Sequence, residues 1–178
     1  CAVLADTGNT SPAALPLPLL SGAVAVLYLC GIPGLLRVGA VLVLLALAAV
    51  WVAALVKMRP AGVLTACKNA LSVPGFVLFL GGAAFIWVLF FVQQPMFTQW
   101  DEFTAWGLAP KMMVERGAFY VADPVNLKAS FTYPATSLFT FLFQPFGQWA
   151  EWACLAAVDT LALACLAAAA ALPRDRWA

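Results

Sequence analysis

The chain has 178 residues, of which 65% are hydrophobic and only 10% are charged, and its formal net charge is +1. Soluble domains contain about 45–50% apolar and about 25% charged residues, so this composition excludes an ordinary water-soluble globule. It also excludes a disordered chain, which needs low hydrophobicity and high net charge. Because the sequence has no basic cluster, nucleic acid is a poor partner as well. The composition therefore predicts an integral membrane protein that contacts the lipid bilayer.

The chain begins with Cys1 rather than Met, and no basic segment precedes the first apolar stretch. This start favours a piece of a longer chain over an intact signal peptide, with a lipid-modified N-terminal cysteine as the alternative. The five cysteines form no Cys-x-x-Cys pair and are interpreted as small membrane-buried residues. The sequence has no histidine, so the commonest general base and the commonest zinc ligand are both missing. No residue is assigned as a metal ligand, and a divalent cation is left open as the one candidate cofactor.

Four apolar stretches are long enough to cross a bilayer, which takes about 20 residues in a helix. They run over 15–32, 38–56, 73–92 and 152–172, with charged or polar residues between them. We expect an all-α fold, a polytopic transmembrane helix bundle. Its parts are an N-terminal segment (1–14), three transmembrane helices (15–92), an extracytoplasmic loop with interfacial helices (93–149) and a fourth transmembrane helix with the C-terminal end (150–178).

Positive charge sets the expected orientation of these spans. Lys57, Arg59 and Lys68 lie between the second and third spans and are the densest positive charge of any short loop. The positive-inside rule places that loop in the cytoplasm, so the long segment 93–149 is external and the C-terminal arginines return to the cytoplasm.

The stretch 133–146 is apolar and aromatic, but as a helix it reaches only about 20 Å. It fits either a helix lying along the interface, with its aromatic side chains as anchors, or a short tilted span. The tilted span would reverse the side of the C-terminus, and the charge pattern favours the interfacial position.

Asp159 is unusual because it lies inside the fourth predicted span. Insertion scales assign a cost of about 2.5–3.5 kcal/mol to an Asp at the centre of a membrane helix. Ala156 and Ala162 are three residues away on either side, so we expect the carboxyl to point at a neighbouring helix, paired or protonated. A functional role and a packing role are equally open for it.

The external segment contains a pattern of helical spacing that begins near the end of the third span. The apolar positions are Trp100, Phe103, Trp106, Pro110 and Met113, and the polar positions are Asp101, Thr104, Lys111 and Glu115. Such a pattern is typical of an interfacial helix with its aromatic residues toward lipid and its charges toward water. Pro110 predicts a kink near Ala109, and Gly117 predicts the end of the helix.

Asp101 and Glu102 form an acidic pair at the start of this pattern. At a membrane surface, such a pair can take a proton from an acceptor hydroxyl or coordinate a divalent cation beside a phosphate. The alternative is an N-terminal helix cap with favourable dipole charges. Lys111, Arg116 and Lys128 suit either a lipid-linked phosphate or simple anchoring to anionic headgroups.

These motifs together resemble a known family. Trp100-Asp101-Glu102-Phe103, Trp106-Gly107, Lys111, Gly117 and Tyr133-Pro134 before an apolar stretch are similar to the GT-C superfamily of membrane glycosyltransferases. That family includes protein mannosyltransferases and lipid A aminoarabinose transferases, which use polyprenyl-phosphate sugars. The resemblance covers residues 73–172, with departures at Pro110, at Phe131-Thr132 and at Ala135, where relatives have a second proline.

The resemblance implies that the chain is the N-terminal membrane portion of an enzyme, inactive alone. The enzyme would move a sugar from a polyprenyl-phosphate donor to a hydroxyl of a glycan, lipid or protein acceptor, on the extracytoplasmic face of the bacterial inner membrane. Asp101 would be the catalytic base, and Glu102 would support it or help to place a divalent cation. The substrate-binding candidates are Trp100, Trp106, Lys111, Arg116 and Tyr133. The alternative is a non-enzymatic polytopic subunit or a transporter fragment, in which Asp159 would be the sensitive position.

Overall fold

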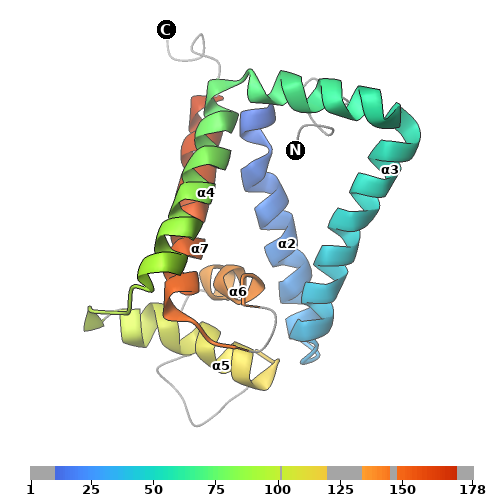
Figure 1. Cartoon of the computed structure of the whole chain (residues 1–178). Helices are drawn as coiled ribbons and strands as arrows, with labels where there is room; N and C mark the ends of the chain where they lie inside the picture. The colour runs from blue at the N-terminus through green and yellow to red at the C-terminus, as the bar shows by residue number, and fades with distance from the viewer. Residues whose placement is uncertain (1–10, 101, 120–133, 145–147, 172–178) are drawn as a thin grey trace, which may run out of the picture. The chain divides into compact units, whose positions relative to one another are not determined.

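The computed structural model describes residues 11–100, 102–119, 134–144 and 148–171, and every element in these ranges is helical (Figure 1). The elements are η1 (Pro12–Ala14), α2 (Pro16–Gly31), α3 (Leu36–Leu71), α4 (Pro74–Gln93), the π-helix η2 (Glu102–Gly107), α5 (Leu108–Arg116), α6 (Pro134–Leu142) and α7 (Glu151–Ala170). Four of them are long and apolar enough to cross a membrane: η1 with α2, then α3, α4 and α7. The predicted all-α class is confirmed, and each of the four predicted spans lies on a helix of membrane-spanning length and hydropathy.

The connection between the second and third spans is a helix rather than an irregular loop. Helix α3 has a sharp bend at Arg59, whose φ of 57° and ψ of 161° are not helical. Pro60 explains the bend, because proline disfavours a helical conformation in the residue before it. The helix then resumes and runs on to Leu71, so that it crosses from the end of one span to the start of α4 (Figure 1).

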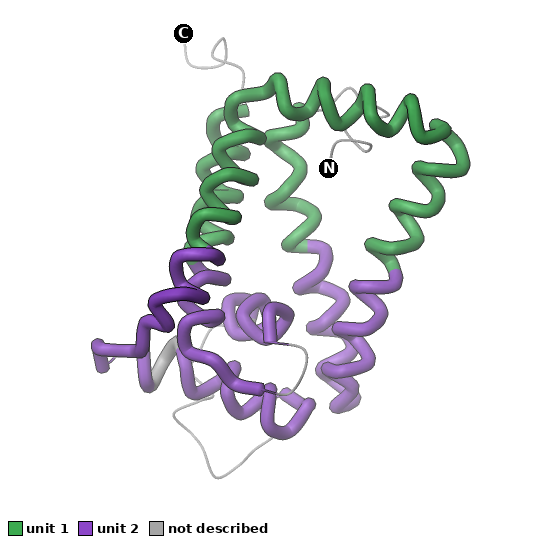
Figure 2. Tube along the Cα trace, in the orientation of Figure 1, with its two compact units in different colours: residues 1–21, 46–86, 159–178 green, residues 22–45, 87–158 purple. Residues whose placement is uncertain are grey.

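The chain divides into two compact units, which Figure 2 shows in different colours. Unit 1 comprises residues 1–21, 46–86 and 159–178. Its small apolar core joins Ala13, Ala70 and Phe76, with Val73 and Ala171 packed against them. The core therefore brings together the start of the first span, the α3–α4 connection and the end of α7. This arrangement agrees with two crossings, by α4 and α7, between the connection and Ala171.

Unit 2 comprises residues 22–45 and 87–158 and contains the larger core. Helices α5 and α6 pack here against the end of α2 and the start of α3. The buried residues of this core are Leu27, Leu36, Ala40, Ala109, Met112, Met113, Val114, Leu138 and Phe141. The described residues of the segment that was predicted to be external, 93–149, thus take part in a packed unit.

Helix α6 is an internal helix of unit 2. Its nine residues reach only about 13 Å, too short to cross a bilayer. The consecutive residues 137–141 are all buried, among them Phe139 and Phe141, which the sequence suggested as interfacial anchors. Phe139 packs its ring against Phe143. These aromatic side chains therefore contribute to the protein core.

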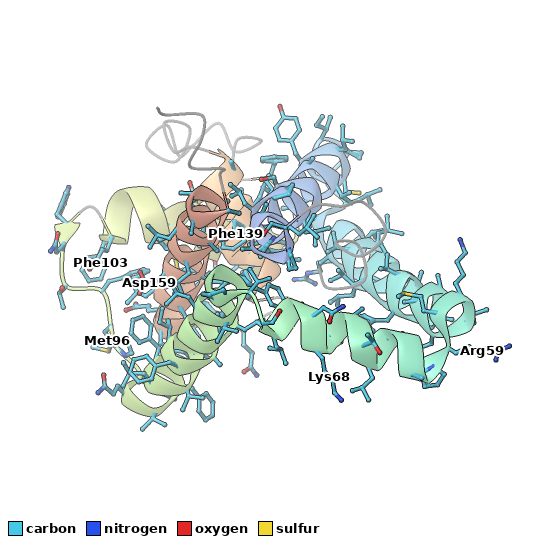
Figure 3. All side chains as sticks on the ribbon, turned by 90° about the horizontal axis from the view of Figure 1, so that it is seen from above. Arg59, Lys68, Met96, Phe103, Phe139 and Asp159 are labelled. Atoms are coloured by element: carbon cyan, nitrogen blue, oxygen red, sulfur yellow. The ribbon has the colours of Figure 1, made fainter. Side chains whose placement is uncertain are left out.

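Asp159 lies on the exposed side of α7 and is labelled in Figure 3. The expectation that it points at a neighbouring helix is wrong for the described part of the chain. The buried side of α7 consists of Ala153, Cys154, Ala156, Ala157, Thr160, Ala164 and Ala167. Ala156 is at the edge of that side, whereas Ala162 is exposed with Asp159. The three-residue spacing from Ala156 therefore did not predict correctly which side of α7 carries the Asp159 carboxyl.

Replacing Asp159 with leucine is expected to favour membrane insertion of α7. On insertion scales a central Asp costs about 2.5–3.5 kcal/mol, whereas Leu contributes about −0.3 to −0.6 kcal/mol. The inserted fraction of the α7 segment, measured by glycosylation mapping in a reporter protein, should rise on Asp159→Leu. Ala162→Leu, on the same exposed side, is the matched control and should change the fraction much less. Equal insertion of the wild-type and Asp159→Leu segments would contradict this expectation.

Candidate functional site

The external segment begins where α4 ends at Gln93. Gln94 has a φ of 46°, a left-handed conformation that stops the helix, and its N–H donates to the Phe90 carbonyl. Phe97 then turns inward and is buried, with its ring packed edge-on against the rings of Phe103 and Trp149. The chain therefore packs into the core of unit 2 again only a few residues after α4 ends.

Glu151 fixes this turn from the start of α7. Its Oε2 accepts a hydrogen bond from the Phe97 N–H at 2.8 Å, although the two residues are 54 positions apart. The Gln144 Oε1 accepts from the Ala150 N–H at 2.8 Å and so holds the residue that precedes α7. Gln144 is only 4% exposed, and its Nε2 has no hydrogen-bond partner among the described residues. Neither Glu151 nor Gln144 was singled out from the sequence.

Glu102 is a helix cap. Its Oε2 accepts the backbone N–H of Thr98 at 2.6 Å and of Gln99 at 2.9 Å. The N–H of Glu102 in turn donates to the Gln99 carbonyl, so the side chain returns to the first residue of the turn as in a capping box. This is the capping role that the sequence left open as an alternative.

The same hydrogen bonds determine the charge of Glu102. The backbone N–H groups of Gln99 and Thr98 favour the ionised form and hold the pKa of Glu102 below its usual value of 4.5. At neutral pH the group is therefore a carboxylate that is already bound to the backbone and is a weak proton acceptor. Its geometry suits a positioning role.

The other residues that the sequence predicts for the site fall into three groups. Asp101 and Tyr133 lie outside the described residues, and for Trp106 only the backbone is described, within η2. Trp100 is 76% exposed, which leaves its ring at the surface. Lys111 and Arg116 lie on the exposed side of α5, and Arg116 is its last residue.

The predicted apolar stripe is split between the surface and the core. Trp100 and Phe103 are exposed as expected, but Pro110 and Met113 are buried in unit 2. The correction has a local cause: η2 is a π-helix, with more residues per turn than the α-helix assumed, so the residues after it rotate to another side. The irregularity predicted near Ala109 is found just before it, and Pro110 lies in the first turn of α5, where a missing N–H is tolerated.

Gly107, where η2 meets α5, permits a close approach of the Phe97 ring. A Cβ at this position would collide with that ring and would lie 2.7 Å from the Glu102 carbonyl oxygen. The Trp-Gly motif therefore has a structural explanation in the packing of Phe97 on η2.

Helix α5 ends as predicted at Gly117, whose φ of 67° is left-handed. Arg37, at the start of α3, donates from its guanidinium to the Val114 carbonyl at 3.2 Å and to the Glu115 carbonyl at 3.4 Å. The Leu36 N–H donates to the Gly117 carbonyl at 3.3 Å. Arg37 thus caps α5 although it lies 77 residues from Val114 in the sequence, and no local pattern around Arg37 indicates this role.

The described residues contain no group of three or more His, Cys, Asp or Glu that could hold a metal ion. The Oε2 atom of Glu102 is already shared by two backbone N–H groups. The described part of the acidic pair therefore does not by itself fit a divalent-cation site.

Comparison of the chain with known protein families, with curated proteins and with solved structures gives no match.

Proposed function

We propose that this chain is the membrane portion of a glycosyltransferase that takes its sugar from a polyprenyl-phosphate donor at the extracytoplasmic surface of the membrane. The proposal rests on the likeness of the Trp-Asp-Glu-Phe and Tyr-Pro motifs to those of GT-C enzymes. The observation that carries the assignment of roles is the capping of Thr98 and Gln99 by Glu102. Because the Glu102 carboxylate already accepts hydrogen bonds from two backbone N–H groups, we assign proton transfer to Asp101, the other member of the pair.

In the proposed reaction, an acceptor hydroxyl attacks the anomeric carbon of the sugar. The bond from that carbon to the phosphate oxygen breaks, polyprenyl phosphate leaves, and the hydroxyl proton passes to the Asp101 carboxylate. Lys111 and Arg116, exposed on α5, would attract the lipid-linked phosphate. The hydrogen bond from the Gln99 N–H to the Glu102 side chain would connect the backbone before Asp101 to the residue after it.

Binding of undecaprenyl phosphate to the purified full-length protein tests the proposal without knowledge of the sugar. Undecaprenol, which lacks the phosphate, is the matched control ligand. We expect the phosphate form to bind at least tenfold more tightly, since charge-assisted contacts to an anion are worth about 1.5–3 kcal/mol. Lys111→Gln with Arg116→Gln should remove most of that difference. Equal affinity for the two lipids would overturn the proposed donor class.

A further inference from the structure

The segment around the bend in α3 is basic and has no compensating acid. Lys57, Arg59 and Lys68 are all exposed, and no acidic residue occurs between Asp6 and Asp101 in the sequence. Figure 3 shows the side chains of Arg59 and Lys68 extending away from the ribbon. The local charge therefore remains uncompensated by nearby side chains of the same segment.

The helical part after the bend, from Pro60 to Leu71, has two different sides. Val63, Ala66 and Ala70 recur at helical spacing and are buried, and Ala70 belongs to the core of unit 1. The opposite side exposes Leu64, Lys68 and Leu71 together. Apolar and cationic side chains on one exposed side are typical of a helix that lies in a membrane interface.

The bend places this helix at the end of a span. The residues just before it are a continuous apolar helix, and Val56, one position before Lys57, is 75% exposed. The helix from Pro60 crosses to the start of α4, the next candidate span (Figure 1). Both ends of the basic segment are therefore attached to helices whose ends lie at the edge of the hydrocarbon.

We propose that the segment 57–71 is a binding surface for anionic phospholipid, with Lys57, Arg59 and Lys68 contacting the headgroup phosphates. Leu64 and Leu71 enter the acyl boundary beside them. The occupant is assigned by charge: three cations in a segment that contains no acidic residue match the negative surface of a bilayer leaflet. The proposal is independent of the glycosyltransferase assignment, since it involves no residue of the external segment.

The test uses the full-length protein in nanodiscs of phosphatidylcholine with one quarter phosphatidylglycerol. After extraction, native mass spectrometry measures the ratio of retained phosphatidylglycerol to phosphatidylcholine. At about fivefold per cation near the surface, the three cations together should enrich phosphatidylglycerol in the wild-type protein by up to about 100-fold. K57Q/R59Q/K68Q should lose this enrichment, and 0.5 M NaCl should weaken it because salt screens surface charge.

The charge-preserving variant K57R/R59K/K68R is the matched control and should retain the enrichment. An unchanged lipid ratio in K57Q/R59Q/K68Q, or loss of enrichment in both variants, would overturn the proposal. The part of undecaprenyl phosphate binding that is lost on Lys111→Gln with Arg116→Gln should be the same in the glutamine variant and the wild type. The outcome for this surface is therefore distinguishable from the outcome for the external site.

Discussion

Asp101→Asn in the full-length protein is expected to lower kcat for sugar transfer by about 100- to 10,000-fold, the range that a general base contributes. Asparagine has nearly the same shape but cannot accept the hydroxyl proton. Transfer from polyprenyl-phosphate mannose and from polyprenyl-phosphate aminoarabinose, with wild-type membranes as reference, would measure the loss. Undecaprenyl phosphate binding should be retained, because the substitution removes the proton acceptor and leaves the cationic residues in place.

Glu102→Gln is the matched control for this substitution. Glutamine keeps one oxygen that can accept from the Thr98 or Gln99 N–H, so the cap is weakened and not abolished. We expect kcat to fall by about two- to tenfold, in line with the loss of a helix cap. Wild-type activity in Asp101→Asn would refute the catalytic assignment. If Asp159→Asn were instead the damaging change, the non-enzymatic alternative would be favoured.

Met113→Ala is expected to lower the free energy of unfolding by about 2–5 kcal/mol. Met113 is 0% exposed and lies at the centre of the unit 2 core with Leu36, Leu138 and Phe141. Truncation removes most of its apolar contacts and leaves a cavity between α5, α6 and the start of α3. An unfolding titration of the purified protein in detergent measures the change.

Met96→Ala is the matched control, because it truncates the same residue type at a position that is 73% exposed. Exposed substitutions away from special features change stability by about 0.5 kcal/mol or less. Equal losses in Met113→Ala and Met96→Ala would mean that the external segment is not packed as described. A much larger loss at Met113 would establish α5 as part of the folded core.

The spans were predictable because hydrophobic length is a local property of the sequence. The four apolar stretches agree with the helices to within a few residues when α3 is taken only as far as its bend at Arg59, and their flanking charges mark most of the ends. The helix from Pro60 to Leu71 was not predicted, because three charges and a proline resemble a loop when its buried partners are unknown. The exposed position of Asp159 was missed for the same reason: sequence spacing gives a helical side but not the neighbour that covers it.

The external site was predictable only in part. Sequence reasoning found the acidic pair and the capping alternative, since a cap depends on residues three or four positions apart. It missed Arg37 and Glu151, because their partners are backbone groups 77 and 54 residues away and any residue supplies such groups. It also misplaced Met113, because one π-helical turn shifts the phase of every residue that follows.

Asp159 also has a consequence for the lipid. Among the described residues it lies on the exposed side of α7, and a polar side chain at such a position draws water and headgroups toward itself, so that the bilayer becomes locally thinner. Helix α4 has the sequence Gly-Gly-Ala-Ala near its centre and exerts no such pull. The membrane around the described helices is then not a slab of uniform thickness, and Asp159→Leu would make it more even.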